Sequence, residues 1–100
     1  MSGVIKTYVL SVEADADLGE IFDYTEQEFG IEQAATYLSE LEIILLALVV
    51  NPKSGRERNE IRAGLRSMIF NSHVIFYRIC DDHLRVVRVL HGSRDLPKFL

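Results

Sequence analysis

Two apolar runs near the end of the chain show the clearest pattern of hydrophobic positions. Residues 72–80 and 84–91 are rich in β-branched and aromatic side chains, and the polar residues 81–83 separate them. Two such runs around a short polar break predict a β-hairpin. Both faces of each predicted strand are largely apolar, so we expect a sheet that is covered on one side and at least partly occupied on the other.

The second of these runs carries charge inside its apolar pattern. Side chains alternate across a strand, which assigns those of this run to two faces, with Leu84, Val86, Arg88 and Leu90 on one and Arg85, Val87, Val89 and His91 on the other. A cation in the middle of a central strand is costly to bury. Arg88 is therefore expected to have a carboxylate partner, to belong to a site or to lie at the rim of the sheet.

The first half of the chain predicts one strand followed by a helix. Residues 4–10 form the apolar run of the strand, and Ser11 follows where a helix N-cap belongs. Apolar residues then recur every three or four positions up to Phe29, which predicts a helix with one buried stripe. Gly30 can end this helix by adopting the left-handed conformation.

A second helix is predicted over residues 31–49, and Asn51 and Pro52 end it. Because only Gly30 separates the two helices, they should fold back on each other as an antiparallel hairpin. The last two turns of the second helix are apolar on all sides, so a stripe that faces the sheet cannot account for every apolar residue. The residues left over are Ile43, Leu46, Ala47 and Val50. Either the rest of the fold or a partner protein must cover them.

The remaining chain predicts a loop, a three-strand meander and a short tail. Residues 51–60 are polar turn formers and predict the loop. The chain is expected to re-enter the sheet at residues 61–66 with a bulge or bend at Gly64, and then to form a strand over 66–70 and a tight turn at 71–72. The predicted order is β-α-α-β-β-β in one domain over residues 1–100, an α+β fold with an antiparallel helical hairpin packed on a mainly antiparallel sheet.

Charge divides the chain into an acidic and a basic half. The net charge is −4, but residues 1–50 hold one basic and ten acidic side chains, whereas residues 51–100 hold ten basic and five acidic ones. This asymmetry predicts either contacts between the second half and an anionic partner or pairing of the two halves across the fold.

The composition predicts a cytoplasmic protein without a membrane segment. The single cysteine excludes an internal disulfide and fits a reducing compartment. The first residues lack the basic segment and apolar run of a secretory signal. The longest uncharged apolar run, residues 43–50, is far shorter than the roughly 20 residues that cross a bilayer.

Signatures of common enzymes are missing from the sequence. It has no phosphate-binding glycine loop, paired-cysteine motif or serine nucleophile elbow. The three histidines and Cys80 lack the spacing of a metal site, so we expect no metal and no cofactor. A basic set stands out instead: Arg62, Arg66, Arg78, Arg85, Arg88 and Arg94, with His73 and His91. Such guanidinium groups can bind phosphate or carboxylate oxygens in a bidentate way, or they can pair with the acidic helices.

Three segments in a fixed order carry a family resemblance: EIRAGLR at 60–66, SHVIFYR at 72–78 and RVVRVLHGSRD at 85–95. Together with ADADL at 14–18 and the Asn51-Pro52 pair, they make the chain similar to ParE toxins of the RelE/ParE superfamily over nearly its whole length. The resemblance implies the RelE/ParE-like fold. It also implies the toxin half of a bacterial type II toxin–antitoxin module of the plasmid stabilisation kind.

The resemblance further implies partners and a mode of action. A ParD-type antitoxin would neutralise the protein in a heterotetramer or larger hetero-oligomer, and DNA gyrase would be the target. We expect no catalytic residue, no membrane partner and no sequence-specific nucleic-acid binding by the toxin alone. The expected target-binding residues are Arg62, Arg66, His73, Arg88, His91 and Arg94, and the expected antitoxin-binding residues are Ile43, Leu46, Ala47 and Val50.

RelE-like relatives provide the alternative function, because they cleave mRNA in the ribosome with basic residues on the sheet and often a tyrosine near the C-terminus. Here Phe99 stands where such a tyrosine would be, and a phenyl ring has no hydroxyl for acid–base work. The preceding loop offers only Lys53 in place of a lysine pair. The function classes left open are a non-enzymatic toxin that binds a topoisomerase, a ribosome-dependent ribonuclease, and a toxin-like fold that survives as a binding module.

Overall fold

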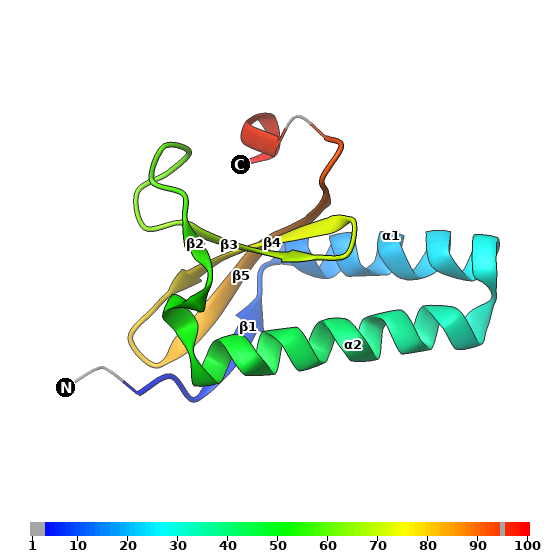
Figure 1. Ribbon diagram of the computed structural model, residues 1–100, viewed down its shortest axis with the longest axis horizontal. Helices are drawn as coiled ribbons and strands as arrows, with labels where there is room; N and C mark the ends of the chain where they lie inside the picture. Colours follow the sequence, from blue (N-terminus) through cyan, green and yellow to red (C-terminus); the bar gives the residue numbers. More distant parts are fainter. Residues whose placement is uncertain (1–3, 95) are drawn as a thin grey trace.

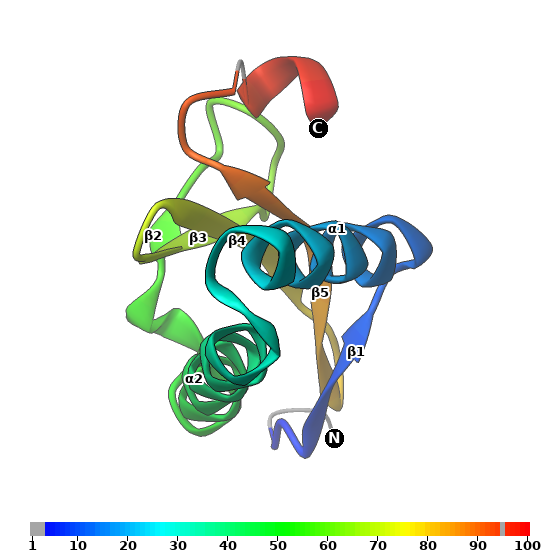
Figure 2. The ribbon, with the colours of Figure 1, turned by 90° about the vertical axis from the view of Figure 1, so that its right-hand side faces the viewer.

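A five-stranded sheet with a helical hairpin on one face forms the protein (Figures 1 and 2). The computed structural model describes residues 4–94 and 96–100. The strands are β1 (Thr7–Leu10), β2 (Arg56–Glu57), β3 (Arg66–Phe70), β4 (His73–Ile79) and β5 (His83–His91). The long helices are α1 (Val12–Phe29) and α2 (Ile31–Val50), and two short 3-10 helices are η1 (Pro52–Ser54) and η2 (Leu96–Phe99). The connected ends of α1 and α2 extend beyond the sheet (Figure 1).

The first and last strands lie next to each other in the sheet, whose order is β1-β5-β4-β3-β2. β1 pairs with β5 in parallel, and every other neighbouring pair is antiparallel. This topology confirms the predicted α+β class and the mainly antiparallel sheet. The two-residue strand β2 was not predicted, because it lies in a polar segment that has the composition of a loop.

Single residues define both ends of α1. The Ser11 hydroxyl accepts a hydrogen bond from the Ala14 N–H at 2.9 Å, which confirms the predicted N-cap. Gly30 ends α1 and begins α2 with φ 94° and ψ 166°. The prediction of a left-handed helical conformation was therefore wrong, since these angles fall in an extended region with positive φ that essentially only glycine adopts. This one residue reverses the chain and produces the predicted hairpin.

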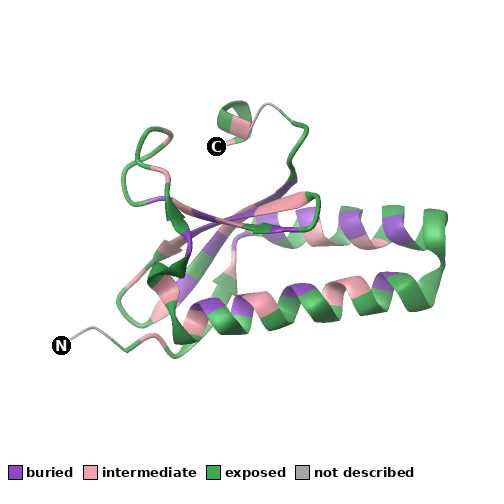
Figure 3. Cartoon of the chain, viewed as in Figure 1, coloured by how far each residue is buried: buried purple, intermediate pink, exposed green. Residues whose placement is uncertain are grey.

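Helix α2 buries one stripe and leaves another in solvent (Figure 3). The buried stripe consists of Ala34, Leu41, Leu45 and Leu48. Ile43, Leu46 and Val50 are 64%, 50% and 86% exposed, and Ala47 is exposed as well. Within the described residues, α2 alone is long and apolar enough to span a bilayer, with a mean hydropathy of 1.6. It packs on α1, β1 and β5, and the core helix of a globular protein meets the same criterion.

A bulge changes which residues of β5 face the helices. Phe76 pairs with Arg88 but Tyr77 pairs with Val86, so that Val87 is the additional residue of β5. The side chains packed on the helices are Leu84, Val86 and Val89, and those on the opposite face are Val87 and Leu90. The predicted division of this strand into two faces was thus wrong from Arg88 onward, because strict alternation cannot anticipate an inserted residue.

The segment before β3 also differs from its prediction. Residues 59–64 form a turn, with φ 81° at Gly64, and the sheet begins again only at Arg66. The expected strand over residues 61–66 was wrong. Of the bulge or bend expected at Gly64, the chain shows a bend, because positive φ here serves the turn. The strand over 66–70 and the tight turn at 71–72 are confirmed.

Apolar residues fill both sides of the sheet, as the two apolar faces of the hairpin predicted. The larger core lies between the sheet and the helices and includes Ile75, Tyr77 and Leu84. A smaller core on the opposite face contains Leu65, Phe76 and Leu90. The C-terminal segment covers this smaller core with Leu96 and Leu100, so the short tail that the sequence predicted has a packing role.

Candidate functional site

The N-cap of α1 and one residue of this helix close the open edge of β5. β1 pairs with residues 83–86, and no other strand of the described residues lies on that side of β5. The Ser11 hydroxyl donates to the Val87 carbonyl at 2.7 Å, and the Asp17 carboxylate accepts the Val89 N–H at 3.0 Å. Asp17 also accepts two hydrogen bonds of 2.8 Å from the Arg88 guanidinium, which raise the pKa of Arg88. Of the three environments expected for Arg88, the structure shows the first, a carboxylate partner, which is Asp17.

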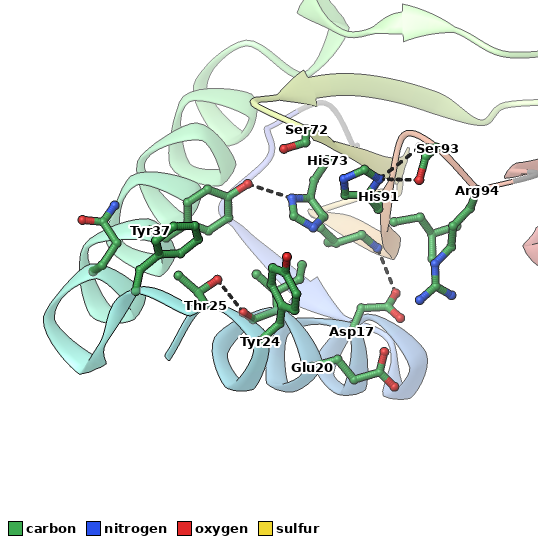
Figure 4. Close-up of a pocket in the computed structure, with 15 residues that line it drawn as sticks. Asp17, Glu20, Tyr24, Thr25, Tyr37, Ser72, His73, His91, Ser93 and Arg94 are labelled. Carbon is green, nitrogen blue, oxygen red and sulfur yellow. Dashed lines mark hydrogen bonds between the residues drawn. The ribbon is translucent and has the colours of Figure 1, made fainter. Parts of the chain in front are cut away.

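A cleft of about 920 Å³ lies beside this edge, between the helical hairpin and the ends of β4 and β5 (Figure 4). The helices supply Asp17, Glu20, Ile21, Tyr24, Thr25, Phe29, Gln33 and Tyr37, and the strands and their ends supply Ser72, His73, Val89, Leu90, His91, Ser93 and Arg94. Tyr24 and Phe29 are 63% and 69% exposed, so large aromatic side chains remain open to a partner. An apolar wall with a few converging polar groups is typical of a binding site.

A histidine pair forms the polar rim of this cleft. His73 and His91 are directly opposite each other on β4 and β5, with ring centroids 5.4 Å apart in an edge-to-face arrangement. The Tyr37 hydroxyl lies 2.7 Å from His73 Nδ1. His91 Nδ1 accepts the Ser93 N–H at 3.1 Å, which places the proton of the neutral ring on Nε2. Both rings are thus oriented by their Nδ1 atoms.

Burial and neighbouring charge act on the first of these histidines. Burial lowers the pKa of His73, and the nearby His91 and Arg94 lower it further. Burial also raises the pKa of the Tyr37 hydroxyl. His73 is therefore held in its neutral form to lower pH than an exposed histidine.

The predicted target-binding residues divide into separate groups. His73, His91 and Arg94 meet at the cleft. Arg88 lies at the adjacent sheet edge and already binds Asp17. The remaining two lie elsewhere: Arg62 belongs to the turn before β3, and Arg66 donates to the Gly55 carbonyl at 2.8 Å and pairs with Glu57 at 3.3 Å. The structure therefore does not bring the six residues into one site.

The predicted antitoxin-binding residues do not line the cleft. Ile43, Leu46, Ala47 and Val50 form an exposed strip on the C-terminal half of α2, which we call the α2 strip. The hairpin thus offers two apolar surfaces, the cleft and the α2 strip.

Sequence reasoning missed Asp17 and the role of Tyr37. Asp17 stands among several acidic residues near the start of α1, although it is only 6% exposed. Its spacing held a signal, because it lies three residues after Ala14 and four before Ile21, on the buried stripe of α1. No comparable signal linked Tyr37 to His73, since that contact depends on how α2 crosses the end of β4.

Metal binding finds no support in the described residues, where no group of three or more His, Cys, Asp or Glu side chains could hold an ion.

Comparison of the sequence with known proteins identifies a family. The family model for the ParE toxin of the type II toxin–antitoxin system parDE matches residues 8–96. Toxin ParE1 of Caulobacter vibrioides is 42% identical over 89 residues, which cover 89% of this chain and 92% of the relative. Toxin ParE1 of Mycobacterium tuberculosis is 42% identical over 94 residues, covering 93% of this chain and 96% of the relative.

A solved structure supports the fold. A chain of the chromosomal ParDE system from P. aeruginosa superimposes with a TM-score of 0.77, at 19% identity, over 90% of this chain and 98% of the other. At this identity the likeness concerns the fold alone, and the family model and the relatives carry the assignment. The chain belongs to the family of ParE toxins of type II toxin–antitoxin systems.

Proposed function

We propose that this ParE toxin acts in the cytoplasm by inhibiting DNA gyrase and that a ParD-type antitoxin neutralises it. The family match over residues 8–96 is the observation that carries the proposal. The fold supports it through a hairpin that presents apolar surface to solvent and a sheet that carries the basic residues.

The α2 strip is the proposed main antitoxin contact. Its three large side chains, Ile43, Leu46 and Val50, are all at least half exposed, and their spacing of three and four places them on one helical face. An amphipathic helix of the antitoxin can cover such a face, and the aromatic residues of the cleft can hold a further part of the same chain. We expect a heterotetramer or a larger complex.

The proposed gyrase contact consists of the basic residues of the second half. His73, His91 and Arg94 supply a polar rim at the cleft, and Arg62 and Arg66 supply cations at the other end of the sheet. Arg88 contributes by position, because its guanidinium binds Asp17 and donates to the Phe99 carbonyl at 3.3 Å. It thereby joins α1 to the C-terminal tail.

Inhibition by binding fits the site better than catalysis. Cleavage of RNA needs a positioned proton acceptor beside phosphate-binding cations. Arg88 is neutralised by Asp17, and the aromatic residue of the tail is Phe99, which lacks a hydroxyl. His73 and Tyr37 bind each other. The proposed toxin therefore acts without a catalytic residue.

Purified gyrase tests the proposal. Toxin added in excess should inhibit supercoiling and increase cleavage complexes, and addition of the antitoxin should reverse both effects. Unchanged supercoiling and unchanged cleavage with toxin well above the gyrase concentration would reject gyrase as the target. Mapping of transcripts after toxin expression is the second readout, and codon-specific cuts in translated mRNA would assign the protein to the ribonuclease branch instead.

A further inference from the structure

The sheet separates the charges of the molecule into two layers. The helices α1 and α2 contain seven and three carboxylates, respectively, and no lysine or arginine. Both helices lie on one side of the sheet, whereas the turn before β3 and the C-terminal tail lie on the other (Figure 1). Among the described residues, Asp17 is the one helix carboxylate that pairs with an arginine. Glu60 pairs with Arg58 at 2.7 Å and Glu57 with Arg66 at 3.3 Å. In the same part of the chain, Arg56, Arg62, Arg78 and Arg85 have no carboxylate within 4.0 Å.

Strand register places these arginines on the face opposite the helices, which we call the basic face. Arg56 pairs with Ser67, which pairs with Phe76, so all three point to the same side as the smaller core. Arg58 lies over the Phe76 ring, 5.9 Å from its centroid. The cations contributed by the strands and by the residue after β2 are Arg56, Arg58, Arg78 and Arg85, and Arg62 and Lys98 flank them from the turn and the tail.

Arg78 and Arg85 are the central feature of the basic face because β4 and β5 place them directly opposite each other. Like charges at such positions destabilise a sheet. Arg78 donates to the Ala63 carbonyl at 2.7 Å, and Arg85 is exposed. Within the described residues, neither has a carboxylate within 4.0 Å. A pair of adjacent guanidinium groups without a counter-charge is arranged to bind an anion.

We infer that the basic face binds the phosphate backbone of double-stranded DNA without reading its sequence. Several guanidinium groups on one side of a sheet match a repeated anion better than a single small one. Proteins that bind single strands add exposed aromatic rings on which bases stack. Here Phe76 is fully buried, and Phe99 is only 38% exposed and lies within 6.0 Å of both the Arg88 and Arg94 guanidinium carbons. The face therefore offers cations without a stacking platform.

Because the net charge of the chain is −4, the contact between the basic face and DNA is weak, and the toxin can bind the duplex in one orientation. The acidic helices are repelled by DNA, so only the basic face can approach it. The inference deepens the proposed function and rests on it in one respect: gyrase would present DNA next to its own surface, so that a weak toxin–DNA contact adds to a toxin–gyrase contact.

Fluorescence anisotropy with the purified chain and a labelled duplex of about 20 base pairs tests the inference without gyrase. We expect measurable binding at about 50 mM salt, weaker binding to a single strand of equal length, and a loss of affinity as salt rises to about 200 mM. The variant R78Q/R85Q should bind the duplex at least about fivefold more weakly and lower the slope of log K against log salt by about 2. R78K/R85K should retain most of the binding.

The matched control is K6Q/K53Q, which removes the same charge at residues outside the basic face. It should keep the wild-type salt slope. No duplex binding by the wild-type chain, equal binding by R78Q/R85Q, or an equal loss in the control would each overturn the inference. If R78Q/R85Q loses gyrase inhibition while the wild-type chain binds no duplex, the basic face binds an acidic protein surface instead. If the wild-type chain inhibits gyrase but does not bind the duplex, the proposed function stands and the DNA-binding inference fails. If the chain binds the duplex but does not inhibit gyrase, gyrase is rejected as the target and the DNA-binding inference stands.

Discussion

Asp17 and Arg88 are joined by two hydrogen bonds of 2.8 Å between the carboxylate and the guanidinium, and Asp17 also accepts the Val89 N–H at 3.0 Å. A helix side chain thus takes the place of a neighbouring strand at the part of β5 that β1 does not reach. Side-chain exposure is 7% for Asp17 and 19% for Arg88, so the pair is shielded from solvent.

Replacing Asp17 with alanine should lower the free energy of unfolding by about 3 kcal/mol, because Arg88 and the Val89 N–H would both lose their partner. Urea denaturation measures this change. Asp17→Asn keeps an acceptor for the backbone N–H and should cost less. The double variant D17A/R88A should lose less than the sum of the two single variants, and strict additivity would show that the pair does not act as a unit.

Tyr77→Phe should destabilise the protein by about 1–3 kcal/mol. The Tyr77 hydroxyl accepts the Gly55 N–H at 2.9 Å and donates to the Pro52 carbonyl at 2.6 Å, so it fastens the segment after α2 to the sheet. Tyr8→Phe is the matched control, because its hydroxyl donates to the exposed Glu42 at 2.8 Å. It should cost less than about 0.5 kcal/mol. Thermal or urea unfolding measures the free energy of unfolding of both variants, and an equal loss in the two would contradict the role of Tyr77.

Stability should decrease as the pH falls below the ordinary histidine pKa of 6.5, because the pKa of His73 is lowered in the folded chain. The unfolded chain then binds a proton that the folded chain does not, which favours unfolding, and the loss is complete once the pH is below the folded pKa. Unfolding measured between about pH 7.5 and 5.5 should show a shallower decrease in His73→Gln than in the wild-type chain. An equally steep decrease in His73→Gln would contradict this prediction.

Leu46→Asp and Val50→Asp should each weaken antitoxin binding by about 2–4 kcal/mol, since both are large exposed side chains of the proposed antitoxin contact, the α2 strip. Isothermal titration with the antitoxin measures the effect, and circular dichroism checks the fold. Val12→Asp changes a residue of α1 that is 84% exposed and lies outside the strip. It should leave the affinity unchanged, and wild-type affinity in both strip variants would remove the proposed contact.

Removal of residues 94–100 should reduce toxicity more than any single arginine substitution. The deletion takes away Arg94 and uncovers the smaller core, where Leu96 and Leu100 pack on Leu90. We expect a stability loss of about 2 kcal/mol from these two partly buried side chains. Growth assays paired with urea denaturation separate loss of contact from loss of fold, and a fully toxic truncation would contradict a role of the tail.

Periodicity predicted most of the fold because its signals are local. Ser11, the stripe of α2 and the turn at residues 71–72 each depend on neighbours in the sequence, and each was found where predicted. The bulge at Val87 and the short strand β2 depend on partners far along the chain. Alternation within one strand carries no information about an extra residue opposite another strand.

The candidate site was predicted in its residue types but not in its grouping. His73 and His91 come together because the first residue of β4 lies opposite the last residue of β5, and Arg94 follows three residues after His91. Arg78 and Arg85 were recognised as basic residues but not as a directly opposed pair, since that contact depends on the register set by the turn between β4 and β5. The position of Asp17 in the helical period indicated a buried residue, whereas its charge indicated an exposed one.

The parallel pairing of β1 with β5 joins the first strand to be synthesised to the last. Thr7 pairs with His83 and Leu10 with Val86, so the first strand leaves the ribosome long before its partner exists. Until then α2 can pack only on the segments made before it, α1 and β1, and contacts between distant segments form late in folding. We therefore expect the helical hairpin to form first and the sheet to close last, so that the proposed antitoxin contact on α2 exists before the toxin is complete.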